Sequence, residues 1–478
     1  MLEKIEPLIC AFRKCFRYKA TFFWFVIVVF GFLVRCDHHG VTSFIRWLFL
    51  HPGHYESLLH FFRSGSWQLE AVLQQWVKIV INRCPIVQFK ERALLIGDGI
   101  KLVKEAKKMP IVKSLKQDSD NSGKAEFIRG HHFGYVGILA GSLTKAFCCP
   151  LHGQLHEGVT EIRAEEGWNG KPATIVTRMV RLVVQKAQET GKLCYVALDA
   201  YFAVGPAFLI FRATLTEKGE QWVHLITRAK GNYVAYWQKP PAEKNAREEQ
   251  KVHLMDLFQS PELFEEIQLE MYGQIKMVSY FCADLYWPAV KGFIRFVFIQ
   301  DGQGQYVLMS SDLELPAPQI ITIYSYRFKI EVMFFFLKHL IGGFKYHFWT
   351  RAMPKLKRGQ TLDYRELDEP SRKKCLLTIE AIERFVNLAG ISLGLLQILS
   401  LTCASQIWSK YRGWIRTISS EIPSEEIVQN VLKTEFFAAP EKVPTFGTLH
   451  IIQAKQDKSR YYSLDRHSAE SVEMTLNF

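Results

Sequence analysis

Two apolar runs that each end in an aspartate constrain the fold of this chain more than any other feature. Residues 93–97 read ALLIG and residues 193–198 read LCYVAL, and Asp98 and Asp199 follow them directly. Apolar runs of this length are typical of buried strands. Between them lie two further strand-like segments and one segment with helical periodicity, at 127–139, 147–155 and 174–190. The sequence therefore predicts the order strand, strand, strand, helix, strand, with an acid at the end of the first and fourth strands.

This order is what a ribonuclease-H-like α/β core requires, because its first and fourth strands are neighbours in the sheet. Asp98 and Asp199 would then lie side by side, although they are 101 positions apart in the sequence. Neighbouring strands are about 4.8 Å apart, so two carboxylates at this place can share metal ions. Their mutual repulsion is costly unless cations neutralise it. Each aspartate taken alone has a simpler interpretation, as the cap of a turn or helix.

A second pattern lies downstream, where Tyr324, Arg327, Glu331 and Lys338 are separated by steps of 3, 4 and 7 residues. On one α-helix, which turns by about 100° per residue, these steps return to nearly the same direction. We therefore expect a single helix, ended by the glycine pair at 342–343, that carries all four side chains on one stripe. The carboxylate could hold a metal and the cations could hold phosphates. The alternative is a simple ion pair between Arg327 and Glu331.

The spacing resembles the Y-(2)-R-(3)-E-(6)-K signature of insertion-sequence-type DDE transposases. The resemblance implies metal-dependent cleavage of DNA at the ends of a mobile element and strand transfer into target DNA, with Mg²⁺ as the cofactor and Mn²⁺ as a substitute. It departs from the common form at Phe328, where tryptophan is frequent. The residues that it implies are, for catalysis and metal binding, Asp98, Asp199 and Glu331, and, for DNA binding, Tyr324, Arg327, Lys338, Arg228 and Lys230.

The rest of the chain is expected to surround this core. Residues 1–88 are predicted to form short helices joined by tight turns. These helices could be a DNA-end-binding domain or a plain helical subdomain. The first part of the core occupies 89–204, and core strands with an inserted antiparallel β subdomain occupy 205–318. Core helices with the signature occupy 319–405, and a helical C-terminal region occupies 406–478. The strands expected between the second aspartate and the signature are at 208–215, 223–227, 275–281, 293–299 and 306–309.

The charge agrees with a nucleic-acid partner, since the formal net charge is +13 and the pI is about 9.1. The resemblance implies double-stranded DNA as that partner, both as terminal inverted repeats and as target, and a homodimer that brings two ends together. Ten cysteines without a C-x-x-C motif favour a reducing cytoplasm. The resemblance implies a bacterial protein that is associated with the nucleoid. A zinc site at Cys148, Cys149, His152 and His156 is a weaker alternative.

One apolar run, at residues 20–34, needs a separate interpretation. It has fifteen residues, whereas a membrane-spanning helix needs about 20. We therefore expect a buried helix of the N-terminal bundle, and membrane binding is not favoured. A second functional alternative is a transposase-derived DNA-binding protein that no longer cuts DNA. The presence of all three acids argues against that alternative.

Overall fold

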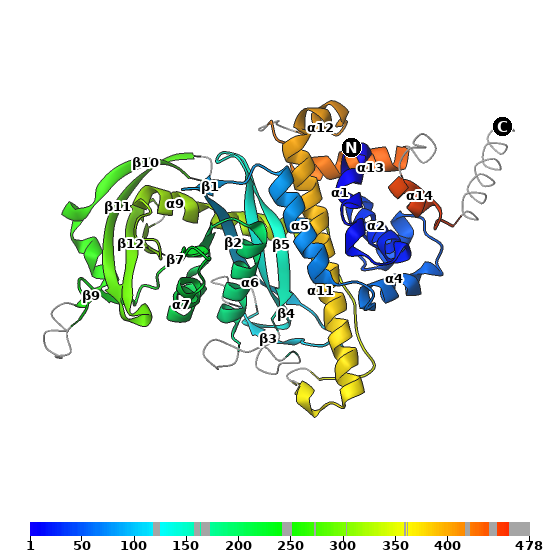
Figure 1. Ribbon diagram of the computed structural model, residues 1–478, viewed down its shortest axis with the longest axis horizontal. Coiled ribbons are helices and arrows are strands. Elements are labelled where there is room, and N and C mark those ends of the chain that lie inside the picture. The colour runs from blue at the N-terminus through cyan, green and yellow to red at the C-terminus, as the bar shows by residue number, and fades with distance from the viewer. Residues whose placement is uncertain are drawn as a thin grey trace. The chain divides into compact units, whose positions relative to one another are not determined.

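The chain forms two compact units in a computed structural model, whose secondary structure is drawn in Figure 1. The first unit comprises Met1–Trp76, Phe336–Phe348 and Glu380–Phe478, and the second comprises Val77–Phe335 and Trp349–Ile379. The described residues are 1–117, 125–156, 163, 173–240, 251–271, 274–302, 304–357, 360, 362–415, 421–438 and 447–457. The end of the expected C-terminal region, 458–478, lies outside them.

A mixed β-sheet runs through the second unit. Its central order is β5-β4-β2-β6-β7, and β13, β12 and β11 continue it beyond β7. The core strands are β2 (Arg92–Val103), β4 (Phe127–Gly141), β5 (Ala146–Leu155), β6 (Cys194–Ala197) and β7 (Val223–Arg228). The further strands are β1 (Gln88–Phe89), β3 (Lys113–Lys116), β8 (Val234–Tyr236), β9 (Lys251–His253), β10 (Glu265–Met271), β11 (Gln274–Trp287), β12 (Gly292–Asp301) and β13 (Gly304–Ser310).

The core strands have the directions that the sequence order predicts. β4 pairs antiparallel with both β5 and β2, whereas β2 pairs parallel with β6 and β6 pairs parallel with β7. The parallel connection from β5 to β6 runs through helix α6 (Ile175–Thr190), which Thr174 caps by accepting the N–H of Thr177 at 3.2 Å. Gly191, with φ of 66°, ends that helix in the left-handed conformation. The predicted strand, strand, strand, helix, strand order is therefore confirmed, and the mixed α/β architecture is consistent with a ribonuclease-H-like fold.

The inserted strands extend this sheet by antiparallel pairing. β7 pairs with β13, and β13, β12, β11 and β10 follow as antiparallel neighbours. The predicted strands at 223–227, 275–281, 293–299 and 306–309 are confirmed. The strand predicted at 208–215 is wrong, because this segment lies in helix α7 (Gly205–Ala213). Pro206 stands in its first turn, where proline favours a helix start, and the buried positions 207, 208, 210 and 211 follow a helical period.

Helices cover both faces of the core strands. A side chain at Gly97 would lie 3.2 Å from the Met179 sulfur of α6, so α6 packs on the face that Gly97 presents. On the other face, Tyr135 of β4 packs against Phe334, with ring centroids 6.1 Å apart. Phe334 belongs to α10 (Lys329–His339), which follows α9 (Ala317–Ser325). The two faces of β2 therefore look toward different helices.

The first unit is helical, and its centre is aromatic. Helix α2 (Lys19–Val34) contains the apolar run at 20–34 and is largely buried, as predicted. Its Phe32 ring lies 4.9 Å from the rings of both Phe44 and Phe385. The described helices with residues in this unit are α1 (Leu2–Cys10), α2, α3 (Thr42–Trp47), α4 (His54–Arg63), α5 (Leu69–Arg83), α10, α11 (Glu369–Thr402), α12 (Ala404–Lys410), α13 (Glu425–Ala438) and α14 (Gly447–Gln453). The boundary between the units falls within α5, α10 and α11.

Helix α11 is the one described helix that is long and apolar enough to span a membrane. Of its most apolar stretch, 89% is buried inside the protein. Core helices of folded proteins have the same composition, so we interpret α11 as a core helix. The sequence predicted core helices in this region, at 319–405.

Candidate active site

Asp98 and Asp199 occupy equivalent levels on two neighbouring parallel strands. The register between β2 and β6 is constant, from Ala93 opposite Cys194 to Ile96 opposite Ala197. This register has the same offset of 101 positions that separates the two aspartates. Continued by two residues, it brings Asp98 level with Asp199. Because neighbouring strands are about 4.8 Å apart, the two carboxylates belong to one site.

Only one of the two aspartates lies at a strand end. Asp199 follows β6 and caps a 3₁₀ turn, Ala200–Phe202, where its Oδ1 accepts the Tyr201 N–H at 3.1 Å. The prediction that Asp98 ends its strand is wrong, because β2 continues to Val103. The reason is the second neighbour of β2: β4 is long, and its antiparallel pairing with β2 continues to Val103 opposite Gly130. Asp98 therefore lies just beyond the part of β2 that pairs with β6.

The Tyr-Arg-Glu-Lys pattern does not lie on a single α-helix. Tyr324 is near the end of α9, Arg327 lies in a 3₁₀ turn (Tyr326–Phe328), and Glu331 and Lys338 are on α10. A 3₁₀ turn advances by about 120° per residue, so the expected common stripe is interrupted at this turn. Helix α10 ends at His339, just before Gly342, whose φ of 67° is left-handed.

Arg327 joins the strand carboxylate to the helix carboxylate. Its Nη1 lies 3.3 Å from Asp98 Oδ2, and its Nη2 lies 2.7 Å from Glu331 Oε1. Asp98 is on the face of the sheet that looks toward α10, since Tyr135, directly opposite Asp98, packs on Phe334 of that helix. The ion pair that the sequence analysis kept as an alternative is thus present. It also links the two parts of the predicted acidic triad.

The surroundings of the two aspartates raise their pKa values, mainly through burial. Burial raises the pKa of Asp98 to about 7, and the charges of Asp199 and Glu331 add to that rise. The N–H of Gly99, which donates to Asp98 at 2.7 Å, and the Arg327 guanidinium act in the opposite direction. Burial also raises the pKa of Asp199, against the Tyr201 N–H, Arg327 and Lys230. A site with this imbalance favours the binding of an additional cation.

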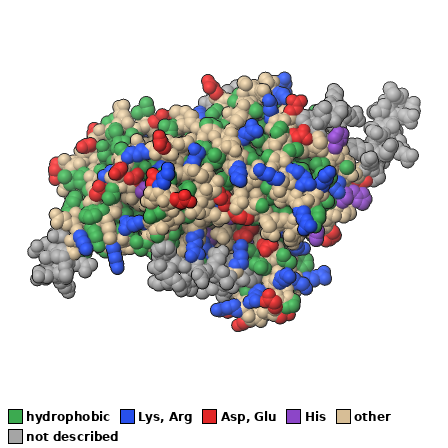
Figure 2. Space-filling model, viewed as in Figure 1, with side chains coloured by type: hydrophobic (Ala, Val, Ile, Leu, Met, Phe, Trp, Pro, Cys, Tyr) green, Lys and Arg blue, Asp and Glu red, His purple; other side chains and the backbone are tan. Residues whose placement is uncertain are grey.

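The remaining predicted DNA-binding residues lie at different distances from the acids. The charge of Lys230 lowers the pKa of Asp199, so Lys230 lies near that acid, and Tyr324 acts on the pKa of Arg327, so it lies near the arginine. Arg228, at the end of β7, instead has its guanidinium over the Tyr306 ring at 5.2 Å. Lys338 is exposed in the last turn of α10, about two turns beyond Glu331. Elsewhere, on the face drawn in Figure 2, Lys and Arg side chains are interspersed with acidic ones.

One family model matches residues 11–277 of the chain, and its description is DDE superfamily endonuclease. The chain belongs to this family. Among curated proteins none matches it. The matched segment contains Asp98 and Asp199 and ends before Glu331. Membership makes the protein a nuclease-type enzyme with DNA as its substrate.

Enzymes of the DDE superfamily use divalent metal ions. Whether such an ion fits this site depends on the side chains that could coordinate it. The endonuclease offers oxygen donors, which suit Mg²⁺ or Mn²⁺. The two aspartates fit a divalent cation, because both belong to one level of the sheet and because burial and the charges of the neighbouring acids raise the pKa of Asp98. Among the described residues, however, no three His, Cys, Asp or Glu side chains are close enough to form a metal site. Glu331 is held by Arg327 instead, and the zinc alternative at Cys148, Cys149, His152 and His156 finds no support either.

One residue beside Asp199, Thr227, was not predicted from the sequence as part of the site. Its hydroxyl donates to the backbone carbonyl of Asp199 at 2.7 Å, and its side chain is fully buried. Thr227 follows Ile226, which stands opposite Ala197 in the register between β6 and β7. The bond therefore fixes the backbone at the point where β6 turns away and presents its acid. Thr227 could have been identified as a polar residue in a buried strand next to the strand that carries Asp199.

Proposed function

We propose that the protein is an insertion-sequence-type DDE transposase, which cuts DNA at the ends of a mobile element and joins the freed ends to target DNA. The observation that carries the proposal is the level pair Asp98 and Asp199, facing the helix that bears Glu331 and joined to it through Arg327. The family match supplies the class of enzyme, and the Tyr-Arg-Glu-Lys spacing suggests the type within it.

Asp98, Asp199 and Glu331 are the residues that would hold Mg²⁺, or Mn²⁺ in its place. When bound, the metal would supply Lewis-acid activation of an attacking oxygen and stabilise the leaving oxygen of the phosphodiester. The protein itself would orient the three carboxylates. Thr227 fixes the backbone of Asp199, and the β2–β6 register sets the spacing of the two aspartates. No side chain has to become covalently attached to DNA in this reaction.

Arg327 has a double role in the proposal. It now neutralises part of the charge of Asp98 and Glu331, which keeps the acids together before a metal is present. A guanidinium at this place is also suited to a DNA phosphate, because it presents several N–H donors in one plane. Lys230, which lies near Asp199, and Tyr324, which lies near Arg327, are the next candidates for the cut strand. Arg228 and Lys338 would contact DNA farther away.

The other parts of the chain complete the proposed assembly. Residues 1–88 would bind the terminal inverted repeats, residues 89–204 and 319–405 would form the ribonuclease-H-like core, 205–318 would add the β-rich insertion, and 406–478 the helical C-terminal region. Cutting two ends together requires two copies of the catalytic site, so we expect a homodimer on DNA. The place of action would be the bacterial nucleoid, in the cytoplasm. DNA binding should weaken steeply with salt, because phosphate contacts release counterions.

The decisive test is cleavage of a supercoiled plasmid that carries the gene with its native flanks, in Mg²⁺ or in EDTA. Wild type should cut at the element ends only with the metal. Glu331→Gln, which keeps the shape of the side chain, should lower the cleavage rate about 1000-fold, since loss of a metal ligand costs several kcal/mol of transition-state stabilisation.

The matched control is Glu217→Gln, which removes the same charge from an exposed residue between α7 and β7. It should cut like wild type. Metal-dependent cleavage that survives Glu331→Gln would refute the assignment of the triad. DNA binding by wild type without any cleavage would instead identify a transposase-derived DNA-binding protein.

A further inference from the structure

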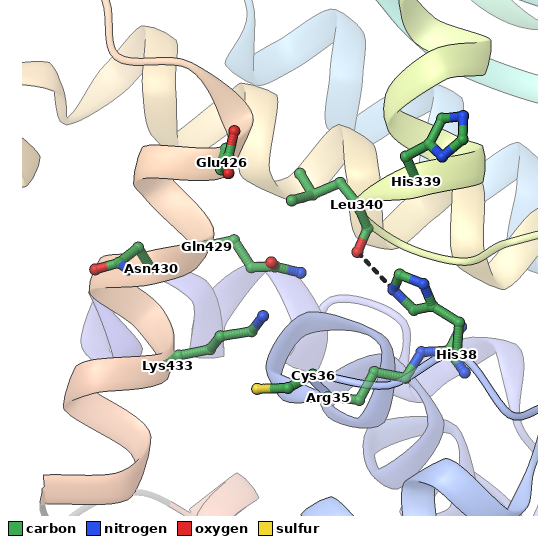
Figure 3. Close-up of a pocket in the computed structure, with 9 residues that line it drawn as sticks. All are labelled: Arg35, Cys36, His38, His339, Leu340, Glu426, Gln429, Asn430 and Lys433. Carbon is green, nitrogen blue, oxygen red and sulfur yellow. Dashed lines mark hydrogen bonds between the residues drawn. The ribbon is translucent and has the colours of Figure 1, made fainter. Parts of the chain in front are cut away.

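A pocket in the helical unit is lined by an unusual set of polar side chains. Its volume is about 230 Å³, and its walls come from the end of α2, the end of α10 and one stripe of α13 (Figure 3). A water molecule takes up roughly 30 Å³ in the liquid, so the pocket has room for more than a single water. None of the residues that line it belongs to the candidate active site.

Hydrogen-bond donors without an acceptor face this pocket. Gln429 is 3% exposed and extends its amide into the pocket (Figure 3), yet its Nε2 has no hydrogen-bond partner among the described residues. Lys433, one helical turn later on α13, also extends into it, and within the described chain no acid lies within 4.0 Å of its ammonium. Buried donors are almost always paired in folded proteins. The buried Gln429 amide is therefore arranged for an acceptor that the described residues do not supply, and the half-buried Lys433 extends toward the same space.

The surroundings favour a negatively charged acceptor. Arg35 lies at the pocket and is fully buried, and its Nε has no partner among the described residues. Its other nitrogens donate to backbone carbonyls, and no carboxylate of the described residues forms an ion pair with it, although the charge of Asp37 raises its pKa from farther away. Burial lowers the pKa of Lys433; Cys36 and Glu426 act against this shift, and the neighbouring Arg35 adds to it. The pocket has one acidic lining residue, Glu426, and that side chain is exposed at its rim.

We propose that this pocket binds a phosphate group, with Lys433 and Gln429 as its direct donors. A phosphate offers several oxygen acceptors, forms strong charge-assisted hydrogen bonds with an ammonium, and balances the excess positive charge. The group could belong to the DNA backbone or to free phosphate, and the chemistry of recognition is the same. The assignment goes beyond the proposed cleavage reaction and does not depend on it; only the choice of DNA as the source uses the substrate of the family.

The first arm of the test uses inorganic phosphate and the full chain. A ³¹P NMR titration of wild type, at constant ionic strength, should show saturable line broadening. Lys433→Met and Gln429→Leu should each weaken binding about tenfold, the loss expected for one charge-assisted or buried hydrogen bond. Lys4→Met, which removes an equal charge from an exposed residue of α1, should bind phosphate like wild type. Equal thermal midpoints without phosphate will verify that all variants are folded.

The second arm distinguishes the two sources. Affinity for a short duplex is measured by fluorescence anisotropy over a range of salt concentrations. If the pocket holds a backbone phosphate, Lys433→Met should reduce the slope of log affinity against log salt by about 0.9, and Lys4→Met should not. An unchanged slope together with weakened ³¹P binding would identify free phosphate as the ligand.

One result overturns the proposal. If wild type and Lys433→Met give the same phosphate titration and the same salt slope, the pocket is not a phosphate site. Glu331→Gln should retain both properties while losing cleavage. A failure of the phosphate site and a failure of the proposed transposase activity are therefore separable.

Discussion

Asp98 and Arg35 are both charged side chains withdrawn from water, and their surroundings are opposite. Arg35, in the helical unit, donates to the carbonyls of Gly40, Ile341 and Gly342 and lies over aromatic rings, with its guanidinium 4.7 Å from the Phe32 centroid. Asp98, in the sheet unit, has one backbone N–H and one arginine against the charges of two other acids. The guanidinium of Arg35 donates to three carbonyls and so links segments that are distant in the sequence, although its Nε has no partner among the described residues. Asp98 instead lies against like charges, an arrangement that is typical of functional sites.

The largest effect that this comparison predicts is at Arg35. Burial lowers its pKa to about 9, so it is still charged at neutral pH. Arg35→Met should lower the free energy of unfolding by about 3 kcal/mol or more, because three carbonyls lose their donor. Urea denaturation measures this loss. The control is Arg46→Met, an arginine half exposed and paired with Asp37, which should cost less than about 1 kcal/mol. Equal costs would refute the structural role of Arg35.

At Asp98, removal of the charge is expected to raise the free energy of unfolding instead of lowering it. Its pKa is raised in the folded protein, so folding opposes its ionisation, and the resulting destabilisation is complete above about pH 7 and fades as the pH falls toward 4. Asp98→Asn should therefore raise the free energy of unfolding by at least about 2 kcal/mol at pH 8 in EDTA, since a rise from 3.8 to about 7, at about 1.4 kcal/mol per pKa unit, is worth up to about 4 kcal/mol. Little difference should remain near pH 4.

Adding Mg²⁺ sharpens the same experiment. At pH 8 the metal should stabilise wild type against urea and should stabilise Asp98→Asn much less, because a ligand that binds only the folded state raises its stability. Asp284→Asn is the control, since Asp284 pairs with Arg295 outside the candidate site. An Asp98→Asn protein that is less stable than wild type at pH 8 in EDTA would contradict the assignment of excess negative charge.

The core of the sheet could be predicted from the sequence because each of its elements is determined by a short stretch of neighbouring residues. The strand order followed from short apolar runs and one capped helix, and the strand order alone brought Asp98 and Asp199 to neighbouring strands. The length of β2 could not be predicted from its own residues, because it depends on how far β4 pairs with it. Helix α7 was misread as a strand because its apolar residues were taken as a run, whereas Gly205 and Pro206 mark a helix start.

The site was predictable in its members but not in its geometry. The spacing of Arg327 and Glu331 allowed an ion pair or a phosphate clamp, and only the fold shows that Asp98 joins the same guanidinium. The 3₁₀ turn at Tyr326–Phe328 has no glycine or proline to announce it. Arg35 was equally hidden, since its partners Ile341 and Gly342 are more than 300 positions away in the sequence. Contacts of this kind are set by packing and not by sequence pattern.

The smallest predicted effect is at Arg327, whose guanidinium lies between Asp98 and Glu331. Arg327→Gln should lower the free energy of unfolding by about 1 kcal/mol at pH 8 in EDTA, because the partly buried Asp98 loses its nearest positive charge. The cost should shrink as the pH falls from 8 to 5, where Asp98 becomes protonated and needs no counterion. Arg372→Gln, which breaks an exposed pair with Glu369 on α11, should show a smaller cost that does not change over this range. If the two variants have the same pH dependence, Arg327 is an ordinary surface ion pair and the contrast with Arg35 fails. If instead Mg²⁺ restores the stability of Arg327→Gln alone, the guanidinium and the metal neutralise the same carboxylates, and the ion pair is the resting form of the site.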